Sequence, residues 1–192
     1  MNLLDRRWPL VMAVILGPGS LYLGLALGTT EPEAWNLAAR YTARVGLPIF
    51  MLAYAASSLL RLAPSATTKA LVRDRRRWGL AFAFTHTIHF GALYMAVTTR
   101  GDSLSLLAPG AVAYLAILAM ALTSSDAAMK ALGANWKRLH RTGIHVIWLV
   151  FTLAYAKRIP EADTMITGLV GTALSLSAAA LRLAAWRKTR RA

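Results

Sequence analysis

The sequence predicts an all-α integral membrane protein, a six-helix bundle formed by one transmembrane domain over residues 1–192. Hydrophobic residues make up 57% of the chain and charged residues 16%, a balance that is unusual for a soluble domain of this length. The apolar residues fall in long runs, each close to the ~20 residues that cross ~30 Å of hydrocarbon. Basic residues gather between these runs, as they do in membrane proteins.

The apolar runs predict six helices, over residues 8–27, 45–62, 78–98, 104–123, 139–155 and 165–186. The first run has no small-residue cleavage pattern after it, so we expect it to be retained as a helix. Gly17-Pro18-Gly19 lies near its middle, and proline removes a backbone donor, so the sequence predicts a kink or a break there. The linkers are short, so consecutive helices are expected to pack as antiparallel neighbours.

The basic residues predict the orientation in the membrane. If the six helices alternate in direction, 17 of the 22 Lys and Arg residues lie on one side and five on the other. The basic side is expected to be cytoplasmic, with both termini on it. The third and fifth helices then run parallel, and the location predicted is a bacterial inner membrane. A formal net charge of +14 is thus explained by topology, and nucleic-acid binding is not expected.

All four histidines lie in the third and fifth predicted helices. They are His86, His89, His140 and His145. An ionisable group inside a membrane span is costly and is therefore a candidate for function. His86 and His89 share a helix face, whereas His140 and His145 point about 140° apart. Imidazoles on facing helices can hold the iron of haem b, so all four are candidate axial ligands, two per haem.

Other uses of the histidines have less support in the sequence. A divalent metal site calls for carboxylates or further histidines, and neither helix contains Asp or Glu. Hydrolytic chemistry lacks an acid that could orient a histidine base. The absence of cysteine excludes thiolate metal sites and haem attached through CxxCH. Hydrogen bonds between helices are the remaining alternative.

Two stretches resemble the ferric-reductase-like transmembrane family, and within it the haem-binding membrane subunits of methionine sulfoxide reductase systems. RRRWGLAFAFTHTIH, residues 75–89, is similar to the third-helix motif RRxLGLxAFxYAxLH. WKRLHR, residues 136–141, is similar to the fifth-helix motif W-x-x-LHR. The resemblance implies haem b and electron transfer across the membrane, and it assigns His89 and His140 as haem ligands.

The chain departs from the family pattern at two positions. Arg75 stands fourteen residues before His89 and Leu153 thirteen residues after His140, where relatives often carry further histidines. The resemblance therefore implies one haem rather than two. In the family's register, His86 and His145 differ in depth by only ~7 Å, and the two motif histidines differ by ~15 Å. The depth comparison thus favours His86 and His145 as the ligand pair, and the motif favours His89 and His140.

The chain contains no GxGxxG motif and no soluble stretch long enough for a flavin or nicotinamide domain. We therefore expect an oxidoreductase subunit that takes electrons from a cytoplasmic flavoprotein or from membrane quinol. The acceptor would lie at the outer face, on a partner membrane or periplasmic subunit. The basic loop at residues 73–77 could dock an acidic flavoprotein or anionic lipid. Alternatives are a non-catalytic accessory or assembly subunit and, because of the interrupted first helix, a small transporter.

Overall fold

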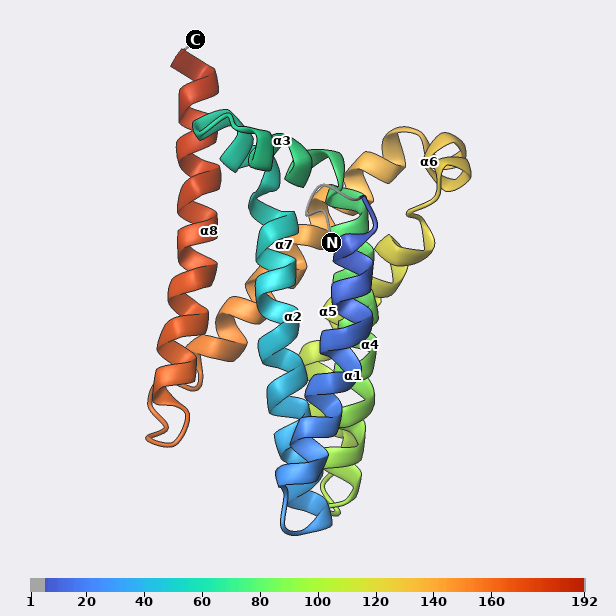
Figure 1. The fold of residues 1–192 in the computed structure, drawn as a ribbon, viewed down its shortest axis with the longest axis vertical. Helices are drawn as coiled ribbons and strands as arrows, with labels where there is room; N and C mark the ends of the chain where they lie inside the picture. The colour runs from blue at the N-terminus through green and yellow to red at the C-terminus, as the bar shows by residue number, and fades with distance from the viewer. Residues whose placement is uncertain (1–5, 192) are drawn as a thin grey trace. The chain divides into compact units, whose positions relative to one another are not determined.

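The computed structural model of the protein describes residues 6–191, without the side chain of Arg191. Residues 1–5 and 192 of the predicted domain lie outside the described residues. Every regular element in the described part is a helix, which confirms the all-α class. The elements are α1 (Trp8–Leu27), α2 (Glu31–Leu62), α3 (Ala66–Arg73), α4 (Arg75–Thr98), the 3-10 helix η1 (Leu104–Leu107), α5 (Ala108–Leu122), α6 (Asp126–Leu132), α7 (Ala134–Ala156) and α8 (Met165–Arg191) (Figure 1).

Five segments in the described residues are long and apolar enough to cross a membrane. They are α1, α2, α4, η1 with α5, and α8. The helix α7 is not among them, because His140, Arg141 and His145 lower its mean hydropathy. The fifth predicted span, over residues 139–155, falls on α7, and both the count of six and the cytoplasmic termini stay predictions.

The main difference from the predicted helices is at the start of α2. This helix begins at Glu31, fourteen residues before the expected start at Val45. A local cap explains the extension: the N–H of Glu33 donates to Thr30 Oγ1 (3.4 Å), and the Glu33 carboxylate accepts from the Thr29 N–H (3.0 Å). Acidic groups also favour the positive end of the helix dipole. The helix α1 is continuous through Pro18, so the break considered at Gly17-Pro18-Gly19 is not present.

Two short helices, α3 and α6, occupy linkers that the sequence left without structure. Both begin at a serine N-cap. Ser65 Oγ accepts from the Thr68 N–H at 3.1 Å, and Ser125 Oγ accepts from the Ala128 N–H at 3.0 Å. Each cap satisfies a backbone donor that the first turn of a helix leaves unpaired. Local hydrogen bonds at these caps thus give the linkers after α2 and α5 a helical structure.

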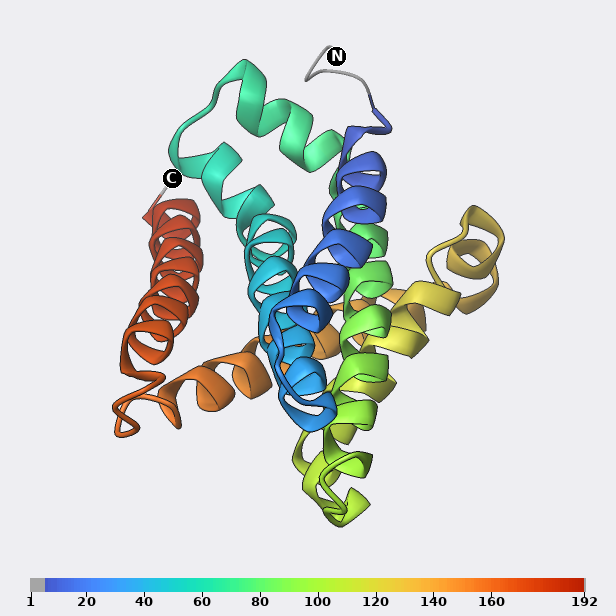
Figure 2. The same cartoon turned by 60° about the horizontal axis from the view of Figure 1, so that its bottom comes forward.

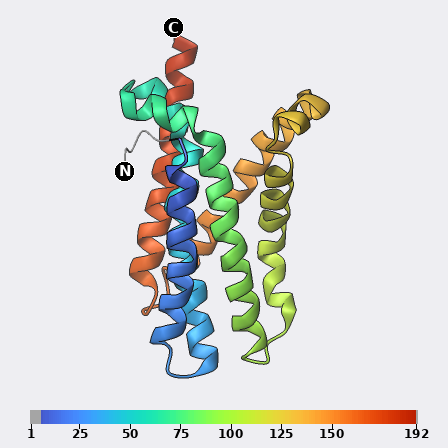
Figure 3. The ribbon, with the colours of Figure 1, turned by 45° about the vertical axis from the view of Figure 1, so that its right-hand side comes forward.

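The described chain divides into two compact units, and α2, α4 and α5 contribute to both. The first unit contains the residues up to Phe50 and Arg77–Tyr114. In it α1, the first part of α2 and α4 lie side by side (Figures 1 and 3). Gly24 on α1 makes this close approach feasible, because a Cβ there would collide with the backbone of Ala38 on α2.

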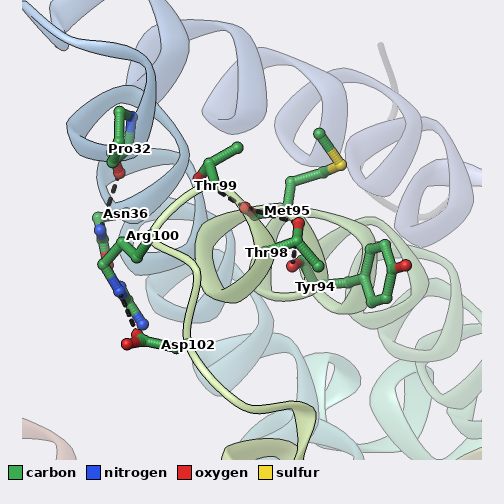
Figure 4. A network of polar contacts seen from close by, with 8 residues as sticks. All are labelled: Pro32, Asn36, Tyr94, Met95, Thr98, Thr99, Arg100 and Asp102. Carbon is green, nitrogen blue, oxygen red and sulfur yellow. Dashed lines mark hydrogen bonds and ion pairs between the residues drawn. The ribbon is translucent and has the colours of Figure 1, made fainter.

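One end of the first unit is held by a polar network around Arg100 (Figure 4). Arg100 Nε donates to the carboxylate of Asp102 at 2.6 Å, and its Nη1 donates to Asn36 Oδ1. Asn36 Nδ2 in turn donates to the carbonyl of Pro32 at 2.8 Å. The network therefore joins the loop after α4 to the first turns of α2.

The second unit contains Met51–Arg76 and the described residues from Leu115 onward. Its α7 and α8 form a helical hairpin joined by residues 157–164 (Figure 2). Trp148 Nε1 on α7 donates to the carbonyl of Ser175 on α8 at 2.9 Å. Gly171 lies against the ring of Tyr155, where a larger residue would collide. Lys188 Nζ binds the carbonyl of Arg61 at 3.0 Å, which ties α8 to the end of α2.

Candidate functional site

The first unit packs His86 among aromatic rings. The residue is only 7% exposed. Its imidazole stacks against Phe82 at 4.9 Å and against Tyr114 of α5 at 5.2 Å between ring centroids. On the α2 side Gly46 packs closely, because a Cβ there would lie only 3.1 Å from His86 Nδ1. His86 is therefore confined on three sides by the fold.

His89, one turn further along α4, is oriented by Thr42 of α2. The Thr42 hydroxyl oxygen lies 3.1 Å from His89 Nδ1. The same hydroxyl donates its single proton to the carbonyl of Ala38 at 2.7 Å, so toward the imidazole it accepts. The proton of neutral His89 then sits on Nδ1, and Nε2 carries the lone pair. This is the tautomer in which a histidine binds a metal through Nε2.

In the second unit, His140 of α7 is held in the same tautomer. Its Nδ1 lies 3.2 Å from the carbonyl oxygen of Trp136, and a carbonyl can only accept. The Trp136 ring stacks on the imidazole at 4.1 Å, and its Nε1 is fixed by the carbonyl of Thr123 at 2.8 Å. The orientation of His140 is therefore set by a hydrogen bond and by a stacking contact.

The other nitrogen of His140 has no hydrogen-bond partner in the part of the chain that the structure describes. Nε2 is buried and makes no hydrogen bond with any described residue. The backbone carbonyl of Met120 is near the ring, but Nε2 does not reach hydrogen-bond geometry with it. A buried lone pair without a donor is unfavourable. The arrangement is what a histidine needs in order to coordinate a metal that is not itself a protein group.

The donor set suits haem better than a bare metal ion. Among the described residues, no group of three or more His, Cys, Asp or Glu side chains could hold an ion. Haem iron takes four nitrogens from its own macrocycle and needs only axial ligands from the protein. Single neutral imidazoles such as those of His89 and His140 meet that requirement.

His145 differs from His140, because both of its nitrogens have partners. Nδ1 lies 3.3 Å from the hydroxyl of Tyr54, and Nε2 lies 3.4 Å from Arg182 Nη2. A guanidinium can only donate, so the lone pair of Nε2 faces Arg182. Coordination of iron through this nitrogen would first require Arg182 to move away.

The four histidines thus form one pair in each unit, His86 with His89 and His140 with His145. Sequence reasoning missed the residues that orient them. Thr42 was assigned to a linker, because the second helix was expected to begin at Val45. The Thr30-x-x-Glu33 pattern, which marks a helix N-terminus, is the signal that would have brought Thr42 into the helix.

The fold and the histidines define a class: an all-helical protein with membrane-length helices and neutral imidazole donors suited to haem. Comparison with known proteins makes this specific. The haem-binding subunit MsrQ of protein-methionine-sulfoxide reductase from Yersinia pseudotuberculosis is 27% identical over 151 residues, 70% of this chain and 73% of that protein. The same subunit from Yersinia pestis is 27% identical over 70% of this chain and 72% of its own length.

The chain is therefore a distant homologue of these subunits, which confirms the resemblance seen in the two sequence motifs. No protein-family model matches the chain. No solved structure matches it either.

Proposed function

We propose that the chain is a haem-binding integral membrane subunit of a reductase system, of the kind represented by the MsrQ subunits of methionine sulfoxide reductase. The observation that carries the proposal is the buried Nε2 of His140, which lacks a partner among the described residues while Nδ1 is bound to Trp136. The names of the relatives and the five membrane-length segments found in the described residues support it.

Within this proposal, His89 and His140 are the residues that would ligate haem b. Both are held as the Nδ1–H tautomer, by Thr42 and by Trp136 respectively. His86 and His145 then have supporting roles, since His86 is packed among rings and His145 faces Arg182. This choice agrees with the family motif rather than with the depth argument.

A haem with two imidazole ligands exchanges single electrons at a potential that ligand basicity and burial adjust. The protein residues orient the imidazoles and exclude water. Thr42 and the carbonyl of Trp136 accept the Nδ1 protons, which would raise the basicity of the Nε2 atoms that would hold the iron. Phe82 and Tyr114 keep the surroundings of His86 apolar.

The direction of electron flow is also part of the proposal. Electrons enter from a cytoplasmic flavoprotein or from quinol and leave at the outer face of a bacterial inner membrane, to a partner subunit. The relatives are named as subunits, which supports a partner. The absence of GxGxxG from the sequence supports an external donor.

The first test is an absorption spectrum of the protein, purified in mild detergent from haem-replete cells, before and after dithionite. We expect a Soret band that shifts on reduction and sharp α and β bands. Alanine variants of the four histidines then identify the ligands: H89A and H140A are expected to lose the low-spin spectrum, and H86A and H145A to keep it. A colourless protein that also fails to take up added haem would contradict haem binding.

The donor is tested in proteoliposomes. A quinol analogue, or NADPH with a flavin reductase, is added outside, and haem reduction is followed by absorbance. Reduction by either donor, with electrons recovered on an acceptor enclosed in the vesicle, is expected. Haem that dithionite reduces and neither donor reduces would contradict the proposed electron source without affecting haem binding.

A further inference from the structure

Two arginines of the second unit bind neighbouring carbonyls of α2. Arg75, the first residue of α4, donates from Nε to the carbonyl of Ala53 at 3.0 Å and from Nη1 to Ser57 Oγ at 3.4 Å. Arg182 of α8 donates from Nη1 to the carbonyl of Tyr54 at 2.9 Å. Its guanidinium carbon also lies 4.5 Å from the centre of the Tyr54 ring. Both guanidiniums are half-buried and fixed at their backbone side.

Neither arginine has a carboxylate partner in the described part of the chain. The ion pairs there are Arg73 with Asp74, Arg76 with Asp126 and Arg100 with Asp102. The two guanidiniums bond the carbonyls of consecutive residues, Ala53 and Tyr54, which brings their charges near each other. Two like charges that are half-buried without a counter-charge are unfavourable unless an anion joins them.

The two guanidiniums keep donors for such an anion. A guanidinium has five N–H groups. Arg75 uses two of its own on Ala53 and Ser57, and Arg182 uses two on Tyr54 and His145, which leaves three on each. The planar fork of a guanidinium matches the two oxygens of a carboxylate. The pair is therefore built for a carboxylate or a similar oxyanion.

We propose that Arg75 and Arg182 bind a propionate carboxylate of the porphyrin, an inference that rests on the proposed haem binding. The porphyrin of haem b carries two such carboxylates, and Arg182 bonds His145, which lies on α7 five residues from His140, the histidine assigned to the iron. All of these residues belong to one unit. A lipid phosphate could use the same donors, but it would not have to lie beside His140.

His145 acts in this arrangement as a positioning residue. Its Nε2 accepts from Arg182 Nη2 at 3.4 Å, and the hydroxyl of Tyr54 lies 3.3 Å from its other nitrogen. The imidazole therefore fixes the rotation of the guanidinium and directs its remaining N–H groups. This explains a histidine in α7 whose lone pair is not available to iron.

The experiment compares haem with its dimethyl ester, in which both carboxylates are blocked. Full-length protein produced without haem is reconstituted in detergent with either porphyrin, and affinity is read from the Soret band. We expect wild-type protein to bind the ester about tenfold less tightly, because hydrogen bonds to charged groups are lost. In R75Q and R182Q the ratio of the two affinities should approach one. R187Q, which removes an exposed arginine five residues along α8, should behave as wild type.

A separate pair of variants tests the role of His145. H145A should reduce the preference for haem over its ester, since Arg182 loses its acceptor. H145Q should restore the preference, because the glutamine oxygen can accept the same bond. The low-spin spectrum should be unchanged in both variants. Equal preference in H145A and wild type would refute the positioning role.

The outcomes separate the inference from the proposed function. Equal affinity of wild type for haem and for its ester, with a normal low-spin spectrum, would overturn the carboxylate site and leave haem binding intact. A protein that binds neither porphyrin would overturn the proposed function itself. If R75Q and R182Q instead lose co-purified anionic lipid and keep the wild-type preference, the ligand is a lipid phosphate and the inference is wrong. The wild-type comparison needs no substitution, so a variant that does not fold leaves the test complete.

Discussion

The hydroxyl oxygen of Thr42 lies 3.1 Å from Nδ1 of His89 and accepts the proton of that imidazole, because it donates its own to the carbonyl of Ala38. One side chain on α2 thus decides which nitrogen of a histidine on α4 is left with a lone pair. The carbonyl of Trp136 has the same effect on His140. In both histidines, which lie in different parts of the chain, a hydrogen bond from Nδ1 leaves Nε2 with the lone pair that can coordinate a metal.

Substitution of Thr42 tests the effect of this hydrogen bond on His89. T42V keeps the shape of the side chain and removes the acceptor, so His89 should bind iron less tightly. We expect haem to dissociate about tenfold faster, in line with the loss of an outer-shell partner. The haem midpoint potential should rise, because a less basic imidazole stabilises ferric iron less. Transfer of haem to apomyoglobin and redox titration measure the two effects.

T42S is the matched control, since serine retains the hydroxyl and should keep both properties near wild type. If T42V and T42S are alike, the hydrogen bond to His89 has no influence on the haem and the tautomer argument fails.

Gly46 provides a test of the role given to His86. An alanine Cβ at this position would lie 3.1 Å from His86 Nδ1, and Phe82 and Tyr114 leave the imidazole little room to move. Overpacking typically costs about 1–3 kcal/mol, more than the ~1 kcal/mol that alanine gains over glycine in a helix. G46A should therefore unfold more easily in an SDS titration while its low-spin haem spectrum persists.

The control for this variant is G91A, because no atom lies within 4 Å of a Cβ at Gly91. It should be as stable as wild type or slightly more stable. A G46A protein of full stability that has lost the low-spin spectrum would instead assign His86 to the iron.

The helices could largely be predicted from the sequence, because a segment that crosses hydrocarbon must be apolar over its whole length. The run from Trp8 to Leu27 gave both bounds of α1 correctly. The start of α2 could not be found in this way, since Arg40 and Arg44 interrupt the apolar run and the helix begins at a local cap around Glu33. The helices α3 and α6 are polar and short, so hydropathy gave no sign of them.

The candidate site could be predicted only in part. The sequence placed four histidines on two helices, which are α4 and α7. It could not rank them, because the contacts that do so join distant residues. Thr42 is 47 positions from His89, and Tyr54 is 91 positions from His145. No periodicity within one helix reports such contacts, and the mutual position of Arg75 and Arg182 was hidden for the same reason.

The ion pair between Arg76 and Asp126 predicts a small dependence of stability on pH. The two side chains meet at 2.5 Å, and the hydrogen bond from Arg76 holds the pKa of the exposed Asp126 carboxyl below its usual value. A carboxyl with a lowered pKa stabilises the folded state above its unfolded pKa of about 4, and this contribution is lost as the pH falls further.

D126N should therefore melt slightly below wild type at pH 7, and the difference should vanish as the pH is lowered beneath about 4. High salt should reduce the difference at pH 7, because both groups are exposed. D163N, which removes an exposed carboxylate of the loop between α7 and α8, controls for the change in net charge. If the difference in melting temperature between D126N and wild type grows toward low pH, the predicted direction of the pH dependence is wrong.

The contact between Gly24 and Ala38 gives the sharpest prediction about stability. A Cβ on Gly24 would collide with the backbone N and Cα of Ala38, and small residues are what allow membrane helices to approach so closely. Because backbone cannot give way as a flexible side chain does, G24A should destabilise the protein by about 3 kcal/mol or more. Replacing Ala38 by glycine as well, in a G24A/A38G variant, should not restore stability, since the clash is with main-chain atoms. G19A, on the same helix with no atom within 4 Å of its Cβ, should be near wild type, and SDS titrations in which G24A matches G19A would show that α1 and α2 do not approach at Gly24.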